Sequence, residues 1–448
     1  MTESNSTDNQ NDTVFAVASG GGKAGISIVR ITGPKTAGIV LSVTGSLPLP
    51  RMASYRAIRH PASREILDQG LVIWFPGPKS YTGEDCAEFQ VHGGSAVVSA
   101  ITLMLSLEPG LRPAHAGEFT QRAFANGKID LSQVEGLADL IDSETEQQRK
   151  QALAQLAGVL GKKIETWRSK LVHALALLEA EIDFVEEGDA PTGILSQVSN
   201  IAALVHDDIA TSLKGSHIFE RIRESLVIVV CGPPNVGKST FFNRLANREV
   251  AIVSERPGTT RDALTFNMDL NGFPVKLVDT AGLRKTRNFV ESRGIERALA
   301  HIASADLVLW LFERPSQLGK SFDLITDGQV WPVQTKADLR PSAAVPGQQQ
   351  ISAYSGEGIS ELLNSIADYA AQLLGQGGEV PLTRARHRLA LAETNAALQR
   401  VKSLSEPASL ELVAEDLRLA VRSLGRITGQ VDVEEILEEI FSKFCIGK

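Results

Sequence analysis

The chain has 448 residues, of which 43% are hydrophobic and 22% charged, and this ordinary globular composition excludes a disordered chain. The length exceeds what one core usually holds, so two or three domains are expected. The formal net charge of −8 does not suggest general electrostatic binding of nucleic acid, so any RNA contact would need a local basic patch or a partner, and no apolar run is long enough to span a bilayer. Without CxxC spacing, Cys86 and Cys231 are interpreted as reduced cytosolic thiols, while the role of Cys445 stays open.

The N-terminal region predicts a small α+β domain behind a disordered tail. Residues 1–12 are polar and acidic and lack the features of a secretory signal. Short strands are expected around glycine-rich and proline-rich turns, followed by one helix. In chain order these elements are Thr13–Val17, Gly25–Ile31, Leu71–Phe75, Cys86–Val91 and the helix Ala96–Leu107. The first predicted domain therefore covers residues 13–128.

Two helical blocks flank a region of alternating strands and helices. Apolar residues from Leu153 to Ile182 recur every three or four positions, which predicts one long amphipathic helix. Further helices are expected at Ile194–Leu213, Leu382–Ser403, Ser409–Ile427 and Val433–Phe444. Residues 226–373 alternate as in a mostly parallel sheet. The predicted fold is multidomain α/β, with a helical domain in two parts, 129–225 and 374–448, and an α/β domain inserted between them at 226–373.

A phosphate-binding loop begins the inserted region. The apolar strand Leu226–Val230 precedes the segment Gly232–Ser239, which fits GxxxxGK[ST], and a helical stretch, Thr240–Leu245, follows. Backbone N–H groups and the helix N-terminus would hold phosphates. Lys238 would bridge the β- and γ-phosphates, and the Ser239 hydroxyl would bind Mg²⁺.

Two switch motifs follow in the order that a GTPase needs. The segment Gly258–Asp262 predicts switch I, with Thr260 as a second hydroxyl ligand of Mg²⁺. The strand Val275–Val278 leads into Asp279-Thr280-Ala281-Gly282. Asp279 would hold the coordination shell of Mg²⁺, and the Gly282 N–H would contact the γ-phosphate.

A base-reading motif completes the set. The strands Leu307–Phe312 and Val330–Val333 precede Thr335-Lys336-Ala337-Asp338. The Asp338 carboxylate would accept two hydrogen bonds from guanine, a donor pair that adenine lacks. Ser352-Ala353 would supply the backbone contact to the guanine oxygen. These motifs, in this order, predict that the inserted domain is a Ras-like P-loop G domain.

Two positions depart from the usual GTPase pattern. Thr335 stands where an Asn usually braces the base loop against the P-loop. Threonine is shorter, so we expect it not to span that gap and predict weaker nucleotide affinity with guanine preference kept. Leu283 replaces a water-orienting Gln, so either hydrolysis is negligible or other groups replace that Gln and the arginine finger. The nearest downstream carboxylates, Glu291 and Glu296, are either candidates for this role or solvated helix residues.

With these motifs the chain resembles the MnmE (TrmE) family of tRNA modification GTPases from Val14 to Lys448. The most specific segments outside the GTPase motifs are Tyr81–Asp85, Val91–Gly94, Gly117–Phe124 and Phe444–Lys448. The resemblance implies a cytoplasmic homodimer formed through folate-binding N-terminal domains. It also implies that the G domains approach each other in the GTP state, helped by K⁺.

The resemblance assigns further roles in the G domain. Asn235, Ser254, Arg256 and Thr259 would form the K⁺ site, and the cation would add the charge that an arginine finger supplies elsewhere. Arg256 replaces an aliphatic residue and would repel K⁺ only if its side chain folds inward. Glu291 matches the general base. The full GTP-binding set is Asn235, Val236, Gly237, Lys238, Ser239, Thr240, Ser254, Glu255, Arg256, Pro257, Gly258, Thr259, Thr260, Asp279, Thr280, Ala281, Gly282, Thr335, Lys336, Asp338, Ser352, Ala353 and Tyr354.

The resemblance also implies a folate site. Arg30, Glu88 and Lys128 match positions that bind a 5-formyl-tetrahydrofolate-type cofactor, and Lys448 and Cys445 would approach that pocket. A cation suits the cofactor's glutamate tail, and a carboxylate suits the N–H edge of the pterin. From the residues alone, the first three would be surface ion-pair residues. Cys445 is either a nucleophile toward a pyrimidine carbon or a buried helix-end thiol.

The implied function is a K⁺-stimulated GTPase that modifies carbon 5 of the wobble uridine of certain tRNAs. It would act with an FAD-dependent partner, MnmG (GidA), in a heterotetramer or larger complex, adding an aminomethyl or carboxymethylaminomethyl group whose carbon comes from folate. GTP hydrolysis would be a conformational timer. Two alternatives stay open: a regulatory GTPase, for instance in ribosome assembly, and a folate-dependent aminomethyltransferase with a vestigial G domain. Intact GTPase motifs argue against the second.

Overall fold

The computed structural model describes residues 12–185, 193–246, 248, 250–252, 265–279, 305–317, 329–339, 348–375, 380–403, 410–431, 436, 437, 440, 441, 444 and 447. The predicted segments Ser254–Thr260 and Thr280–Gly282 lie outside these residues, as do Leu283, Glu291, Glu296, Cys445 and Lys448. The chain divides into two compact units, residues 1–138 with 425–448, and residues 139–424. Among the described residues, no helix has the length and apolar character needed to cross a membrane.

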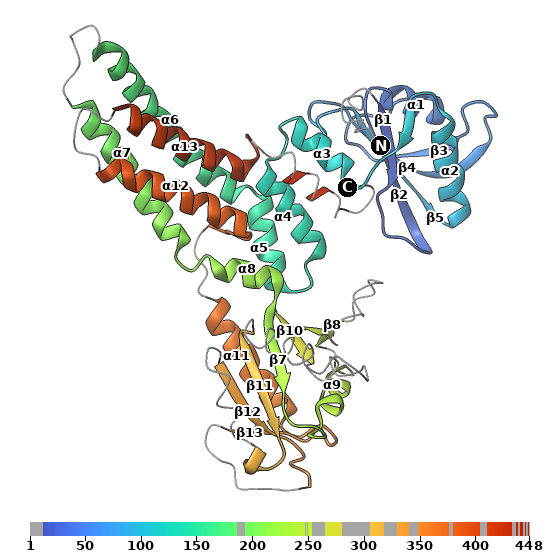
Figure 1. The fold of residues 1–448 in the computed structure, drawn as a ribbon. Coiled ribbons are helices and arrows are strands. Elements are labelled where there is room, and N and C mark those ends of the chain that lie inside the picture. The colour runs from blue at the N-terminus through green and yellow to red at the C-terminus, as the bar shows by residue number, and fades with distance from the viewer. Residues whose placement is uncertain are drawn as a thin grey trace, which may run out of the picture. The chain divides into compact units, whose positions relative to one another are not determined.

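The first unit is built on a six-stranded sheet with the order β3-β4-β5-β2-β1-β6. Figure 1 labels β1 to β5 of this sheet, in blue. Its strands are β1 (Thr13–Val17), β2 (Ala24–Thr32), β3 (Ser54–Arg59), β4 (Ile66–Phe75), β5 (Cys86–Gly93) and β6 (Leu111–Pro113). Neighbouring strands are antiparallel except for the parallel pair of β1 and β6. In the ladder between β2 and β5, Arg30 stands directly opposite Glu88. This register places a cation beside a carboxylate on one face of the sheet.

Helices cover both faces of this sheet. They are α1 (Thr36–Thr44), α2 (Ser95–Leu107) and α3 (Glu118–Ala125), followed by α4 (Leu131–Asp142), in which the boundary between the units falls. Buried residues of α1 and α2 pack with Phe15 of β1 in the main core, whereas Phe119 of α3 packs with Val14 and Ala16. Alternate residues of a strand point to opposite faces, so α3 covers the face away from α1 and α2. Near the C-terminus, Phe441 and Phe444 pack with Val134 of α4.

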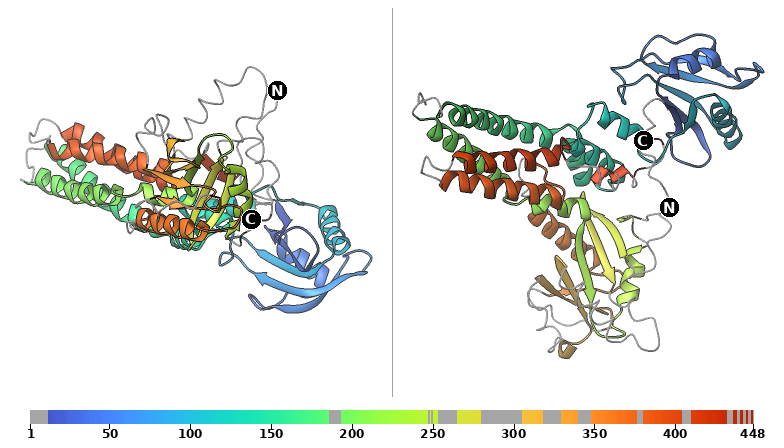
Figure 2. Two further views of the ribbon diagram at one scale, coloured as in Figure 1. Left: turned by 90° about the horizontal axis from the view of Figure 1, so that it is seen from below. Right: turned by 45° about the horizontal axis from the view of Figure 1, so that its top comes forward.

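The helices of the second unit that lie outside its α/β part form a helical layer, most of it an elongated bundle. They are α5 (Glu146–Leu156), α6 (Val159–Val185), α7 (Ile194–Leu213), α8 (His217–Glu224), α12 (Ala385–Ser403) and α13 (Leu410–Thr428), whose last turn belongs to the first unit. Helices α6, α7, α12 and α13 lie side by side (Figures 1 and 2). Their buried face includes Trp167 and Leu171 of α6 and Val205 of α7. Burial of such apolar stripes supplies most of a bundle's stability.

The expectation of a single helix from Leu153 to Ile182 is wrong, because α5 ends before α6 begins. Gly158 has a φ of +78°, and its N–H donates to the carbonyl of Gln155 at 2.9 Å. A left-handed glycine of this kind ends a helix. The apolar spacing continues across the break, so periodicity alone did not reveal it.

The α/β part of the second unit has a seven-stranded sheet with the order β13-β12-β11-β7-β10-β9-β8. Its elements are β7 (Leu226–Cys231), α9 (Lys238–Ala246), β8 (Ala251–Ile252), β9 (Thr265–Leu270), β10 (Phe273–Asp279), β11 (Leu307–Phe312), the 3₁₀ helix η2 (Pro315–Gln317), β12 (Gln329–Gln334), β13 (Gln349–Gln350) and α11 (Ile359–Leu374). Strands β7, β10, β11, β12 and β13 are parallel, and β9 is antiparallel to β10. The predicted mostly parallel α/β sheet is confirmed.

Buried strand β7 lies at the middle of this sheet. Ile228 and Val230 pack with residues of α9 and α11 on one face, and Val229 and Cys231 belong to the core of the other face. A parallel strand that is buried on both faces reads as a continuous apolar run, as Leu226–Cys231 does. The loop that leaves its carboxyl end therefore starts from a rigid position.

The hairpin of β9 and β10 contacts the first turn of α5. The Gln147 N–H donates to the Gly272 carbonyl at 3.0 Å, and the Asn267 side chain donates to Glu144 at 3.3 Å. The first N–H groups of a helix have no partner within that helix, so the hairpin turn supplies one. The sheet and the helical layer of the second unit are thereby joined at the hairpin.

Candidate functional site

The loop between β7 and α9 has the form of a phosphate-binding loop. Gly232 has a φ of +145°, and a Cβ there would lie 2.2 Å from the carbonyl oxygen of Leu311 on β11, so only glycine fits. Lys238 Nζ donates to the carbonyl oxygens of Gly232 and Pro233 at 2.7 and 2.9 Å, which places the ammonium group within the loop. Ser239 and Thr240 are exposed in the first turn of α9. Backbone N–H groups, a helix N-terminus and a cation therefore converge.

Asp279 ends β10 at the same edge of the sheet. It pairs with Val230, at the end of the neighbouring parallel strand β7, and is 2% exposed. The Asp279 carboxylate and the Ser239 hydroxyl, in the loop and helix that follow β7, are oxygen ligands of the kind that Mg²⁺ prefers. The donor chemistry therefore fits the predicted metal site, of which the structure describes Ser239 but not Thr260.

The expectation that Thr335 is too short to reach the P-loop is wrong. Its Oγ1 donates to the carbonyl of Val236 at 2.7 Å, and its own N–H donates to the carbonyl of Phe312 at 2.8 Å. The second bond holds Thr335 at the end of β11, close enough for a short hydroxyl to bridge the two loops. Thr335 is 4% exposed, so this contact is shielded from water.

The remaining base-loop residues lie beside this contact. Lys336, whose φ is +58°, forms an ion pair with Glu313 at 2.8 Å, and Asp338 is exposed. The Ala337 N–H donates to the carbonyl of Ile351 at 3.2 Å, which connects the loop to the segment that follows β13.

That segment carries the second predicted base contact. Ser352 is fully buried, and its Oγ accepts from the Ser355 N–H at 3.1 Å. Arg244 of α9 donates to the Ser355 carbonyl at 3.0 Å, whereas Ala353 is half-buried and Tyr354 is exposed. The phosphate loop, residues 335–338 and residues 352–354 all lie at the carboxyl edge of the sheet, where open α/β sheets bind ligands.

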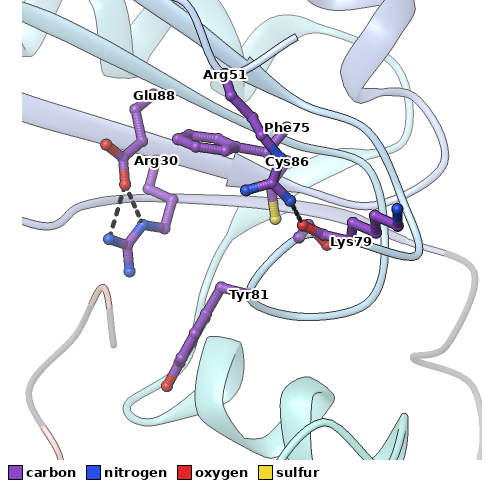
Figure 3. Close-up of a pocket in the computed structure, with 8 residues that line it drawn as sticks. Arg30, Arg51, Phe75, Lys79, Tyr81, Cys86 and Glu88 are labelled. Carbon is purple, nitrogen blue, oxygen red and sulfur yellow. Dashed lines mark hydrogen bonds and ion pairs between the residues drawn. The ribbon is translucent and has the colours of Figure 1, made fainter.

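A separate pocket of about 330 Å³ lies in the first unit (Figure 3). It is lined by Arg30, Arg51, Phe75, Lys79, Ser80, Tyr81, Cys86 and Glu88. Arg30 Nε and Nη2 both donate to one oxygen of Glu88, at 3.0 and 2.8 Å. The guanidinium also lies 5.8 Å from the ring centres of Tyr81 and Phe119. The predicted residues Arg30 and Glu88 thus meet in one pocket, held by cation–π contacts as well as an ion pair.

Two family models match this chain. They are the GTP-binding protein TrmE N-terminus, over residues 13–128, and the MnmE helical domain, over residues 131–445. A relative from Methylobacterium sp. (strain 4-46), the tRNA modification GTPase MnmE, is 50% identical over 442 residues, which cover 98% of this chain and 100% of the relative. The chain belongs to the MnmE family of tRNA modification GTPases.

Other members give the same assignment. The tRNA modification GTPase MnmE of Rhodopseudomonas palustris (strain BisB5) is 46% identical over 460 residues, covering 97% of this chain and 99% of the relative. The protein of the same name from Beijerinckia indica is 48% identical over 437 residues, covering 98% and 96%. A likeness to the G domain of the T. maritima FeoB iron transporter covers 32% of this chain and 98% of that one, with a TM-score of 0.26 and 24% identity, and adds nothing to the assignment.

Lys128 and Gly447 contact the surroundings of this pocket in different ways. Lys128 is exposed and does not line the cavity, but its Nζ donates to the carbonyl of Pro78 at 2.8 Å, in the loop that carries Lys79. Arg30 Nη1 donates to the carbonyl of Gly447 at 3.5 Å. This contact places Gly447 beside Arg30, whereas Cys445 and Lys448, which the resemblance brings near this pocket, lie outside the described residues.

Sequence reasoning missed several residues that line this pocket. Arg51, whose side chain donates to the Lys79 carbonyl, and Lys79 itself belong to loops without a recognisable pattern. Tyr81 belongs to the segment Tyr81–Asp85, one of those that carry the family resemblance, so this segment could have indicated Tyr81 as a site residue. Burial raises the pKa of Tyr81 above its ordinary value, against the opposing effects of Thr120 and Arg30, so its hydroxyl stays neutral at physiological pH. With three cations and one carboxylate, the lining favours an anionic ligand.

Proposed function

We propose that this protein is a GTPase that acts in tRNA modification, with GTP bound at the carboxyl edge of the seven-stranded sheet. The observation that carries the proposal is the meeting of the Lys238 loop, Asp279 and the Thr335 base loop at that edge, in a chain that belongs to this family. Lys238 would contact the β- and γ-phosphates, and Asp338 would read guanine.

The finer chemistry rests on the family resemblance. Mg²⁺, bound by Ser239 and Thr260, would neutralise phosphate charge, and K⁺, bound by Asn235, Ser254, Arg256 and Thr259, would add positive charge beside it. Glu291 would orient the attacking water.

We infer further that the pocket of the first unit binds a 5-formyl-tetrahydrofolate-type cofactor. Arg30, Arg51 and Lys79 suit its carboxylates, and the ring of Tyr81 offers an aromatic face. Lys128 and Lys448 would complete the site, with Cys445 close by. Acting as a homodimer with the FAD-dependent protein MnmG, the protein would transfer the carbon to the wobble uridine of certain tRNAs.

Mass spectrometry of wobble uridines tests this function in cells that carry either Lys238→Ala or Arg30→Ala. Both variants should lose the modified nucleoside, because one lacks the phosphate-binding cation and the other lacks the pocket's central cation. Normal modification in both cells would remove the assignment. Equilibrium dialysis with 5-formyltetrahydrofolate separates the main alternative, since a purely regulatory GTPase should not bind it.

A further inference from the structure

One wall of the pocket in the first unit is an irregular loop, Pro76–Asp85, between β4 and β5. Lys79, Ser80 and Tyr81 of this loop line the pocket, and Phe75 and Cys86 flank the loop. A loop of this length has no strand partners of its own, so other contacts must fix its shape.

Helix α3 and the turn after it supply those contacts. Three side chains on this side bond three residues of the loop, Tyr81, Thr82 and Glu84, and we call these pairs the α3 clasp. They are Thr120 Oγ1 with the Tyr81 hydroxyl at 2.8 Å, Arg122 Nη1 with Glu84 Oε2 at 3.1 Å, and Asn126 Nδ2 with the Thr82 carbonyl at 2.8 Å. The Lys128 contact with Pro78 extends the same series.

The helix side of the clasp is itself anchored. Glu118, which is 5% exposed, accepts hydrogen bonds from Arg112 at 2.7 Å and from Arg122 at 2.9 Å. On the loop side, Thr32 of β2 donates to Glu84 at 3.1 Å and lies 2.7 Å from the Thr82 hydroxyl. Buried, charge-assisted contacts of this kind hold one geometry because any alternative would leave charges unpaired.

We propose that the α3 clasp positions the ligand-binding wall of the pocket, with Thr120 and Asn126 acting through the loop and not by touching the ligand. The inference rests on the proposed folate function. Neither residue lines the pocket. Thr120 fixes Tyr81, whose ring faces Arg30, and Asn126 fixes the backbone one residue further along. The clasp thereby sets the space between Arg30 and the loop wall before a ligand arrives.

The test uses the full-length protein with the exposed variant Asn126→Ala, the near-isosteric Thr120→Val, and the control Gln121→Ala at an exposed position of α3. Each clasp variant loses one hydrogen bond, so the Kd for 5-formyltetrahydrofolate should rise about fivefold. Amide hydrogen exchange across Pro76–Asp85, measured without ligand, should become faster. GTP hydrolysis should be unchanged, and Gln121→Ala should match the wild type throughout.

The outcomes separate this inference from the proposed function. If the wild type does not bind 5-formyltetrahydrofolate, the proposed function fails, and loop exchange, which needs no ligand, still decides whether the clasp holds the wall. If both variants exchange and bind like the wild type, the clasp has no positioning role. Weaker binding with unchanged loop exchange would mean direct contact with the ligand, which also overturns the inference.

Discussion

Thr335 joins the base loop to the phosphate loop through a single hydroxyl group. The bond to the Val236 carbonyl is 2.7 Å long and buried, so its loss leaves a carbonyl short of a donor in a site that water does not reach. The residue therefore does the bracing that an asparagine usually does at this position, which removes the physical reason for expecting weak nucleotide binding.

Thr335→Val should weaken binding of GDP and GTP about tenfold, because a methyl group replaces the bridging hydroxyl at nearly constant volume. Fluorescent-nucleotide titration measures the change, and dissociation should be faster in proportion. Thr335→Ser keeps the hydroxyl and serves as the matched control. An unchanged Kd in the valine variant would show that the bridge contributes nothing to nucleotide binding.

Asp338 carries the predicted discrimination between guanine and adenine. Asp338→Asn places N–H groups opposite the N–H groups of guanine, so the Kd for GTP should rise by at least about tenfold while weak ATP binding changes little. A competition experiment between GTP and ATP gives the ratio of their Kd values directly. Leu339→Ala, at the neighbouring exposed position, controls for disturbance of the loop. If the ratio of the ATP and GTP Kd values is unchanged in Asp338→Asn, another residue must distinguish guanine from adenine.

At the scale of elements, helix α3 depends on the ionised state of Glu118. Burial alone would raise the pKa of Glu118, but hydrogen bonds from Arg112, the His115 N–H and Arg122 outweigh it and hold the pKa below the ordinary 4.5. A carboxyl group with a lowered folded-state pKa stabilises the fold above its unfolded pKa, and this contribution is lost as the pH falls through the folded value.

The thermal stability of the first unit should therefore fall as the pH drops below about 4.5, through protonation of Glu118 among other carboxylates. Melting curves of the wild type and Glu118→Gln, recorded from pH 7 to pH 3, isolate the contribution of Glu118 to this stability. The variant should be less stable at pH 7, and its difference from the wild type should shrink as the pH falls. A constant difference over the whole range would exclude this titration.

The phosphate loop could be predicted from sequence because its strand, glycines and helix are contiguous. The break at Gly158 could not, because the apolar spacing of α5 continues into α6. Strand β3 was not predicted because Ile58 is its one fully buried apolar side chain, and a single such residue does not make the alternating apolar pattern that indicates a strand. Arg51 and Lys79 meet in the pocket only through the tertiary fold, which brings together loops with no local signal.

At the scale of the whole molecule, the β9–β10 hairpin connects the two predicted switch segments to helix α5 of the helical layer. One end of the hairpin follows residues 253–264 and the other precedes residues 280–304, which contain the two predicted switch motifs. Its turn bonds the first turn of α5 through the Gly272 carbonyl and the Gln147 N–H. Any movement of the predicted switches would therefore act on this helix terminus, as the conformational timer that the family resemblance implies would require.

Gln147→Pro should uncouple the two activities, because proline is tolerated in a helix's first turn but lacks the N–H that bonds Gly272. GTP hydrolysis should stay near the wild-type rate, while wobble-uridine modification in cells should fall about fivefold for the loss of one coupling bond. Gln147→Ala keeps the N–H and is the control. Equal modification in both variants would show that the hairpin contact transmits nothing.

The two ends of the predicted nucleotide-binding domain, at α8 and α11, lie close together. Helix α8, just before β7, contacts helix α11, and Ile222 of α8 and Leu374, the last residue of α11, are buried in the same hydrophobic cluster. A fragment from His217 to Gly375 would therefore have neighbouring termini and its own core, and should be separable as an autonomous piece. The rest of the chain, rejoined by a short glycine–serine linker across the excision, should retain its pocket without any nucleotide chemistry.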